Sequence, residues 1–174
     1  GFAGAIATDN KKIADKIDCA INMGKPGSTR YKEADTLGFR GASQELQCGL
    51  AYAGFRHMDE WQKQRQKIIR KIWSELENLP IRFIKGGKYC LSSYHKIPLE
   101  IENRNDFIKF MKANGIDARL TYVTNWSKTF GSGKTMPMSD RLSNSTCNLP
   151  LSPFFKEAEV QKIIKTVKRY FSAG

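Results

Sequence analysis

The spacing of apolar residues changes at Pro80, and this change constrains the fold more than any other feature of the chain. From about Ser43 up to that proline, residues that would lie on one face of a helix recur every three to five positions. They are Leu46, Leu50, Ala53, Met58, Trp61, Arg65, Ile68, Ile72 and Leu76. The spacing predicts one uninterrupted helix of about 35 residues, roughly 50 Å long, which Gly49 and Gly54 could bend. The apolar stripe is too wide for a simple coiled coil, so we expect a helix that bridges two bodies.

Beyond the proline the apolar period becomes two, which predicts strands over residues 81–85 and 89–101, joined by a hairpin turn at Gly86-Gly87. Pro98 has no N–H to donate, so we expect its strand to lie at a sheet edge or to end there. Also expected are a helix capped by Asn103 or Asn105 and ended by Gly115, a short strand over 116–121, a short helix over 138–145, and a final amphipathic helix after Pro153. This order predicts an α+β unit.

The first residues predict a different kind of unit. Residues 2–8 have the composition of a buried strand, Asp9 is a candidate N-cap, and Ile13, Ile17 and Ile21 recur at helical spacing up to Gly24. Residues 25–41 are predicted to form a loop. One buried strand needs neighbours to pair its backbone groups, so we expect its partners to lie outside this sequence.

Composition excludes several classes of protein. The net charge of +12 is compatible with an anionic partner, but the basic residues are interleaved with apolar core positions rather than gathered in a block. We therefore expect mostly a solvated surface and no binding of nucleic acid. No apolar run approaches the roughly 20 residues that span a bilayer. The 4 cysteines form no C-x-x-C pair, so free thiols in a cytoplasmic protein are expected rather than a zinc site.

Several motifs occur in an order that resembles a known family. Residues 1–8 (GFAGAIAT) are similar to a glycine-rich strand, and Leu37-Gly38 and Glu45-Leu46-Gln47 stand in the register of a following loop and helix start. Further on are Ser93-Tyr94-His95, Gly115-Ile116-Asp117-Ala118-Arg119, and Asn148-Leu149-Pro150-Leu151-Ser152-Pro153. Together they resemble the C-terminal half of the DegT/DnrJ/EryC1/StrS family of pyridoxal-phosphate-dependent sugar aminotransferases.

The resemblance implies an α/β protein with an α+β small domain, namely the C-terminal part of an aspartate-aminotransferase-like (fold type I) enzyme. Residues 1–41 would be the end of the large cofactor domain, 42–80 a long bridging helix, and 81–174 the small domain. The family binds its cofactor through a lysine that would precede Gly1, as would the aspartate that holds the pyridine nitrogen. We therefore expect a fragment that cannot transaminate alone, because that amine carries the cofactor and moves the proton.

The parent enzyme would be a homodimer that binds pyridoxal 5'-phosphate and aminates a nucleotide-linked keto-sugar, with glutamate as the amino donor. Arg40 stands where the family has an asparagine that contacts the cofactor phosphate of the partner subunit; the alternative is a solvated loop residue. The resemblance also places five residues on loops that meet the nucleotide-sugar: Arg30, Tyr31, Arg119, Tyr122 and Trp126. For Trp126, packing is an equally good interpretation.

Two other interpretations remain open at the level of sequence. One is a small basic module that binds a phosphorylated ligand or nucleic acid without catalysis, and it predicts salt-dependent binding. The aromatic residues are scattered rather than interleaved with a basic stripe, which weakens this interpretation. The other is a regulatory relative that keeps the fold without the chemistry.

Overall fold

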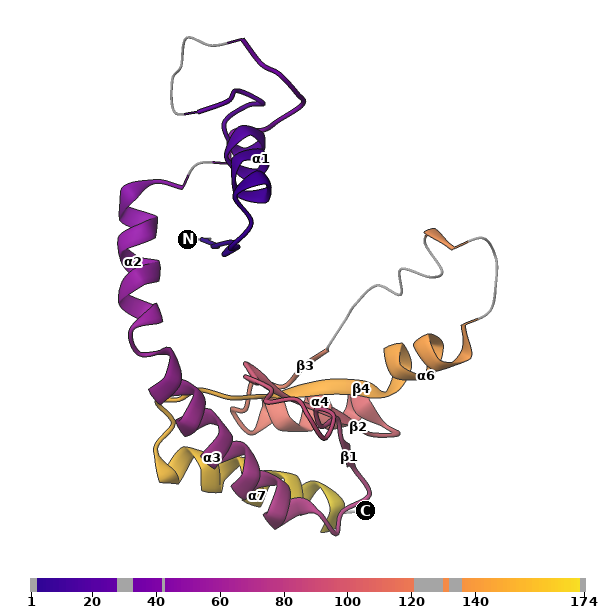
Figure 1. Ribbon diagram of the computed structural model, residues 1–174. Coiled ribbons are helices and arrows are strands. Elements are labelled where there is room, and N and C mark those ends of the chain that lie inside the picture. The colour runs from indigo at the N-terminus through magenta and orange to yellow at the C-terminus, as the bar shows by residue number, and fades with distance from the viewer. Residues whose placement is uncertain (1–2, 28–32, 42, 121–129, 132–135, 173–174) are drawn as a thin grey trace. The chain divides into compact units, whose positions relative to one another are not determined.

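The computed structural model describes residues 3–27, 33–41, 43–120, 130–131 and 136–172. The chain divides into two compact units, unit 1 over Gly1–Met58 and unit 2 over Asp59–Gly174. Each is treated by itself below, and the course of the chain is drawn in Figure 1. The three-part division expected from the sequence remains a prediction.

Two helices, α2 (Glu45–Phe55) and α3 (Met58–Leu76), stand in place of the single uninterrupted helix that the apolar spacing predicts. The N–H of His57 bonds to the carbonyl of Gly54 at 3.1 Å, a tightened turn of the kind that ends helices. Gly54 weakens the helix at this point, since glycine is the least favourable helix residue after proline. The boundary between the two units follows directly, at Met58.

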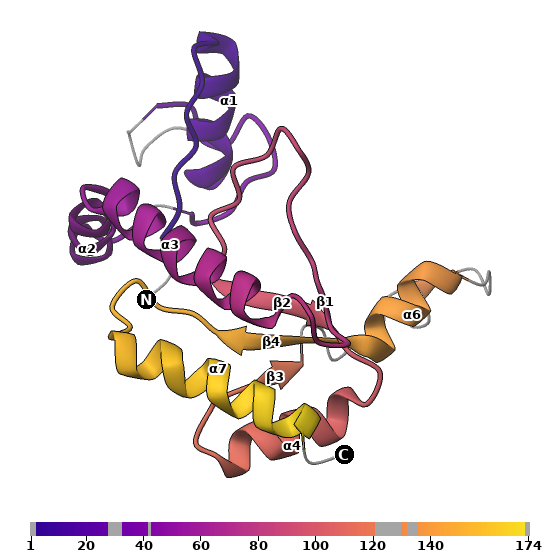
Figure 2. The same cartoon turned by 90° about the horizontal axis from the view of Figure 1, so that it is seen from below.

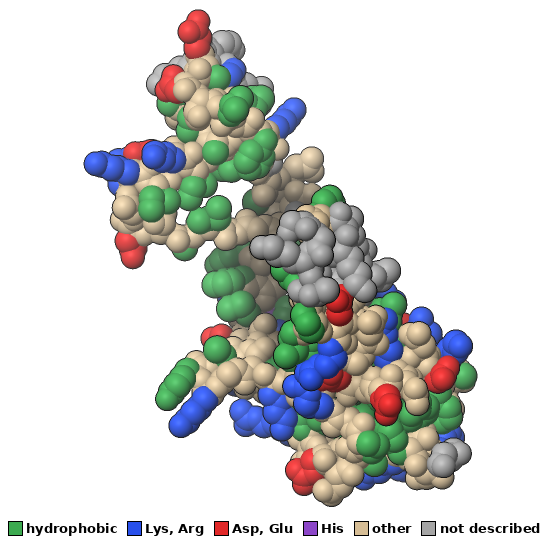
Figure 3. Space-filling model, turned by 90° about the vertical axis from the view of Figure 1, so that its right-hand side faces the viewer, with side chains coloured by type: hydrophobic (Ala, Val, Ile, Leu, Met, Phe, Trp, Pro, Cys, Tyr) green, Lys and Arg blue, Asp and Glu red, His purple; other side chains and the backbone are tan. Residues whose placement is uncertain are grey.

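Unit 1 holds α1 (Lys11–Ile21) and α2. The N-cap of α1 is Asn10, whose side chain accepts from the backbone N–H groups of Lys12 and Ile13 at 3.0 and 3.3 Å, one residue after the expected Asp9. Residues 3–8 form no strand, which agrees with the need of such a strand for neighbours. Among the described residues of unit 1 only Gly24 is buried. Large hydrophobic side chains of unit 1, among them Leu37, Leu46 and Leu50, are accordingly exposed. Figure 3 shows hydrophobic side chains on the surface of the molecule.

Unit 2 is built on a four-stranded sheet in the order β1-β2-β4-β3. Its strands are β1 (Arg82–Phe83), β2 (Lys96–Glu100), β3 (Arg119–Leu120) and β4 (Thr146–Pro150), and all neighbouring pairs are antiparallel. β1, β2 and β3 are shorter than the predicted runs, β4 was not predicted, and the stretch between β1 and β2 is mostly irregular rather than a tight hairpin. In Figure 2 the sheet lies behind α3, α4 (Arg104–Ala113) and α7 (Glu157–Ser172).

Pro98 lies on β2, an interior strand, which the sequence did not predict. Its carbonyl accepts from the N–H of Ile84 at 3.0 Å, so its nitrogen also faces the side of β1. β1 ends at Phe83, and the missing N–H therefore falls where the short outer strand stops. Proline is tolerated at this position because its nitrogen faces the edge strand β1 and not β4, so the hydrogen bonds between β2 and β4 are unaffected.

The core of unit 2 lies between the sheet and the helices. It is formed by the buried side chains of Ile68, Ile69, Ile72, Leu76, Ile97, Leu99, Ile101, Phe107, Ile108, Met111, Ile116, Ala118, Cys147, Leu149, Val160, Ile163, Ile164 and Val167. The α7 residues among them are those expected from its helical spacing, and Asn103 is the N-cap residue of α4 as expected. Because β2 and β4 use alternate residues for this core, their other residues face the opposite side of the sheet.

Candidate functional site

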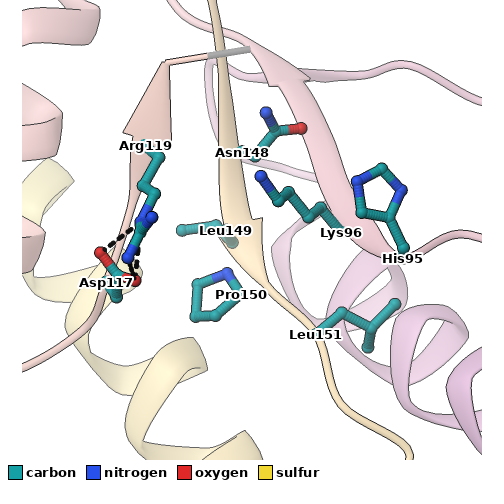
Figure 4. A pocket seen from close by; sticks show the side chains of 8 residues that line it. All are labelled: His95, Lys96, Asp117, Arg119, Asn148, Leu149, Pro150 and Leu151. Carbon is teal, nitrogen blue, oxygen red and sulfur yellow. Dashed lines mark hydrogen bonds and ion pairs between the residues drawn. The ribbon is translucent and has the colours of Figure 1, made fainter. Parts of the chain in front are cut away.

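A cavity of about 180 Å³ lies on the sheet of unit 2. Figure 4 shows its eight lining residues: His95, Lys96, Asp117, Arg119, Asn148, Leu149, Pro150 and Leu151. We call this cavity the sheet pocket. It gathers three basic side chains and one amide around one carboxylate, a composition suited to binding an anion.

Strand alternation and register bring these residues together. Ile97 and Leu99 point into the core, so Lys96 belongs to the outer set of β2 residues. Lys96 pairs with Pro150 on β4, and Asn148 of β4 pairs with Arg119 on β3. In Figure 4 the Lys96 side chain extends from β2 toward β4, and Arg119 lies on the other side of β4.

Arg119 is oriented by Asp117 within the sheet pocket. The guanidinium Nε lies 2.9 and 2.8 Å from Oδ1 and Oδ2 of Asp117, and Nη2 lies 2.7 Å from Oδ2. The hydrogen bond from Arg119, reinforced by its charge and by those of Lys112 and Lys96, lowers the pKa of Asp117 below its usual value. The same pair raises the pKa of Arg119. Both groups are therefore charged at neutral pH.

At the other end of the outer sheet face one carboxylate is shared by two arginines. Glu100 accepts from Arg82 Nε at 2.7 Å and from the Ser145 hydroxyl at 3.0 Å, and Arg141 Nε lies 3.2 Å away. Burial by itself would raise the pKa of Glu100, but hydrogen bonds from Arg82 and Ser145 and two arginine charges lower it overall. The interaction with Ser145 also connects α6 (Pro137–Ser145) to β2.

The structure brings one predicted substrate residue, Arg119, into the sheet pocket. The predicted residues Arg30, Tyr31, Tyr122 and Trp126 lie outside the described residues. Three lining residues were missed by the sequence analysis as ligand contacts: His95, Lys96 and Asn148. The signal available for them was the alternation around Ile97 and Leu99, which marks Lys96 as outward-facing but does not say which strand lies beside it.

Arg40 lies in unit 1, where a turn positions its backbone. The N–H of Phe39 bonds to the carbonyl of Ala20 at 2.8 Å, that of Gly41 bonds to Ile21 at 2.8 Å, and Arg40 bridges Asn22. Gly38 permits this approach, since a Cβ there would lie 2.0 Å from the backbone nitrogen of Gly24. The Arg40 residue itself is exposed, so its guanidinium is accessible to a phosphate.

Unit 1 does not enclose a complete site for pyridoxal phosphate with its described residues. Such a site needs an amine at the ring, donors for the phosphate and an acid beside the ring nitrogen. Every described Asp and Glu of unit 1 is exposed, and Gly24 is the one buried residue there. Among these residues Arg40 is the one that the sequence analysis assigned to the cofactor phosphate, and that assignment remains a prediction.

The comparison with known families decides what kind of protein this is. The sequence model of the DegT/DnrJ/EryC1/StrS aminotransferase family matches residues 1–168. The chain belongs to the DegT/DnrJ/EryC1/StrS aminotransferase family. Its motifs in residues 1–8 and 37–47, and those that border the sheet pocket, lie inside the matched range.

Relatives of this aminotransferase-family chain include the erythromycin biosynthesis sensory transduction protein EryC1 of Saccharopolyspora erythraea. That protein is 23% identical over 97% of this chain and 47% of its own length. The dTDP-3-amino-3,6-dideoxy-alpha-D-galactopyranose transaminase of Aneurinibacillus thermoaerophilus is 20% identical over 96% of this chain and 46% of its own length. The chain thus spans about half the length of the curated relatives it matches.

Solved structures of the same family share the fold. A DegT DnrJ EryC1 StrS aminotransferase from Brucella abortus superimposes with a TM-score of 0.83 at 21% identity, covering 94% of this chain and 44% of that one. DesV of S. venezuelae, in complex with a ketimine intermediate, gives 0.84 at 19% identity over 94% and 45%. The expected α/β fold, that of the C-terminal part of a pyridoxal-phosphate aminotransferase, is confirmed. Across the described residues, no helix of this family member has the length and apolar character needed to cross a membrane.

Proposed function

We propose that this chain is the C-terminal part of a pyridoxal-phosphate-dependent aminotransferase that acts on a nucleotide-linked keto-sugar in the cytoplasm. The observation that carries the proposal is the family match over residues 1–168, together with a relative named as a transaminase of a dTDP-linked amino sugar. Glutamate is proposed as the amino donor. When bound, pyridoxal phosphate supplies an electron sink for the carbon that exchanges its amino group.

In this proposal two arginines of the chain bind phosphate groups. Arg40, exposed on its turn, contacts the phosphate of the cofactor, and Arg119, held by Asp117, faces the substrate. A guanidinium suits both roles, because its planar fork matches phosphate oxygens and stays charged. Arg30, Tyr31, Tyr122 and Trp126 are retained as proposed substrate contacts.

We also propose that the parent enzyme is a homodimer. Helix α2 supports this, since it carries apolar residues on all sides and buries none of them, with Leu46, Leu50, Tyr52 and Phe55 exposed. A helix that is apolar all round is normally covered on more than one side. The cofactor phosphate would then be contacted by Arg40 of the second subunit.

The test compares the natural polypeptide that contains this sequence with the 174 residues alone. Each is incubated with pyridoxal phosphate, glutamate and a dTDP-linked keto-sugar, and the amino sugar is sought by mass spectrometry together with 2-oxoglutarate. We expect both products from the natural polypeptide and neither from the 174 residues. If the natural polypeptide forms no amino sugar from dTDP- or UDP-linked keto-sugars, the proposed function is wrong.

Arg40→Ala in the natural polypeptide tests the cofactor contact. Loss of a charge-assisted contact to phosphate should weaken the affinity for pyridoxal phosphate by about tenfold or more, measured by absorbance titration. Arg40→Lys should recover part of that affinity, and Arg56→Ala, an exposed arginine at the end of α2, is the matched control. If Arg40→Ala left the affinity for pyridoxal phosphate unchanged, Arg40 would be a solvated loop residue without a contact to the cofactor.

A further inference from the structure

We propose that a second cavity of unit 2 binds a small organic cation, one that carries an alkylated ammonium group on a short apolar body. This cavity, which we call the aromatic cavity, has a volume of about 490 Å³ and is lined by Pro80, Ile101, Glu102, Asn103, Phe110, Tyr170 and Phe171. Figure 2 shows the two helices that supply its rings, α4 and α7. It shares no lining residue with the sheet pocket, and the inference does not rest on the proposed function.

Three aromatic rings line the aromatic cavity. The Tyr170 ring centroid lies 5.0 Å from that of Phe171 at an interplanar angle of 86°, and 5.4 Å from that of Phe110 at 60°. Rings inclined so steeply direct their electron-rich faces in different directions, as in aromatic sites that bind alkylated ammonium ions. The Phe110 ring already attracts a cation, since Cζ of Arg169 lies 5.5 Å from its centroid. Arg169 donates to the Asn114 side chain and does not line the cavity, which leaves that space to a ligand.

Glu102 is the one charged residue among those that line the aromatic cavity. Among the described residues it has no ion pair, whereas Glu100, two positions earlier, is held by Arg82. An unpaired carboxylate at the edge of an apolar wall attracts a cation at short range. The net charge of +12 opposes this attraction little, because exposed charges are screened beyond about 8 Å at physiological ionic strength.

The size and the wall of the aromatic cavity indicate the class of cation. Its volume falls within the roughly 300–1,000 Å³ of pockets that hold small molecules. Burial and the charge of Asp106 raise the pKa of Tyr170, so this ring stays neutral at physiological pH. Pro80 and Ile101 add apolar surface. A trimethylammonium group suits such a wall, because its methyl groups need no hydrogen-bond acceptor and its charge is attracted by ring faces.

The experiment titrates the natural polypeptide that contains this sequence with benzyltrimethylammonium and with three probes of nearly equal shape. These are choline, neohexyl alcohol, in which carbon replaces the charged nitrogen of choline, and the anion tert-butylacetate. Calorimetry measures the affinities, and methyl NMR of Ile101 reports whether the cavity is occupied. We expect benzyltrimethylammonium to bind with a Kd of about 1 mM or tighter, and choline to bind about fivefold or more tighter than neohexyl alcohol.

Two results of the titration would overturn the proposal. One is the absence of binding by both cations up to about 10 mM. The other is an equal affinity for choline and neohexyl alcohol, which would show a merely apolar cavity.

Phe171→Leu tests the contribution of a ring face, because leucine keeps apolar volume and has no ring. We expect it to weaken benzyltrimethylammonium binding about fivefold or more. Phe154→Leu, at an exposed phenylalanine that does not line the cavity, is the matched control and should change the affinity less than about twofold. Equal weakening by the two variants would mean that the rings of the cavity do not hold the cation.

Glu102→Gln tests the carboxylate and should weaken binding of the same cation about threefold or more. Its control is Asp59→Asn in the first turn of α3, at the opposite end of that helix from Pro80. Glu102 also precedes Asn103, the N-cap of α4, where a carboxylate stabilises the helix end. If Glu102→Gln lowers the melting temperature but leaves the affinity unchanged, Glu102 serves only α4 and the cation site is wrong. Tighter binding of tert-butylacetate than of choline would likewise contradict it, in favour of an anion at the N-terminus of α4.

Discussion

Helices α2 and α7 show how differently the two units of this protein depend on their surroundings. In α7 the apolar residues form one face, and Val160, Ile163 and Ile164 are buried against the core of unit 2. In α2 the apolar residues surround the helix, none is buried, and Leu50 is 67% exposed. An amphipathic helix needs one packing partner, whereas a helix that is apolar all round needs several. Unit 2 therefore contains its own core, whereas α2 in unit 1 has no buried residue.

The largest expected effect comes from exchanging one phenylalanine in each unit. Phe107 is fully buried and its ring packs edge-on against Tyr170 at 5.2 Å, so Phe107→Ala should lower the free energy of unfolding by about 3–5 kcal/mol. Phe55→Ala in α2 should change it by less than about 0.5 kcal/mol, since Phe55 is exposed. Urea unfolding followed by circular dichroism measures both values.

Equal losses in the two variants would contradict the contrast between the units. If Phe107→Ala does not fold, Phe107→Leu supplies the comparison, with an expected loss of about 1–2 kcal/mol because most of the apolar volume is kept. Phe55→Leu is then its matched control.

A smaller effect is expected from glycine substitutions within unit 1. A Cβ at Gly38 would meet the backbone nitrogen of Gly24 at 2.0 Å, whereas nothing lies within 4 Å of one at Gly49. Gly38→Ala should therefore cost about 1–3 kcal/mol locally and raise the hydrogen exchange rates of the Phe39 and Gly41 amides by about tenfold or more. Gly49→Ala, in the interior of α2, should leave those rates unchanged and favour the helix by about 1 kcal/mol.

If Gly38→Ala left both amides as protected as in the wild type, the turn that positions Arg40 would not depend on the close approach of these two glycines. The packing around Gly24, the only buried residue among those described in unit 1, would then contribute little to the stability of that unit.

The smallest effect concerns the buried thiol of unit 2. Burial raises the pKa of Cys147 from 9.0 to about 12, although the charge of Arg104 opposes the rise. The folded pKa is the higher one, so this contribution to stability is complete below pH 9 and is lost progressively between pH 9 and 12. At pH 10 the loss should be about 1.4 kcal/mol relative to pH 8.

Two variants isolate that contribution from the other groups that titrate in alkali. Cys147→Ala should flatten the fall in stability between pH 8 and 10 by about 1.4 kcal/mol, whereas Cys90→Ala, at an exposed cysteine, should not change it. Parallel curves for the wild type and Cys147→Ala, measured by urea unfolding at each pH, would show that Cys147 is not shielded from water.

Much of unit 2 was predictable from local pattern. The spacing of Val160, Ile163, Ile164 and Val167 predicted α7 and its buried face, and Asn103 and Gly115 bracketed α4, because capping and periodicity act within a few residues. The division between α2 and α3 was not predicted, since the apolar spacing continues across Arg56 and His57 while the backbone turns. Of the strand expected at residues 2–8, the described residues 3–8 form none, because strand pairing depends on partners outside the segment.

By itself the sequence determined the family, the helices α4 and α7 of unit 2 and Arg119 as a candidate ligand residue, because each depends on residue identity and local order. Only the tertiary structure decided that His95, Lys96 and Asn148 join Arg119 in one pocket. The strand order β1-β2-β4-β3 places β4 between β2 and β3, segments that are far apart in the chain. Strand order and register follow from long-range pairing and burial, which no local pattern of residues encodes.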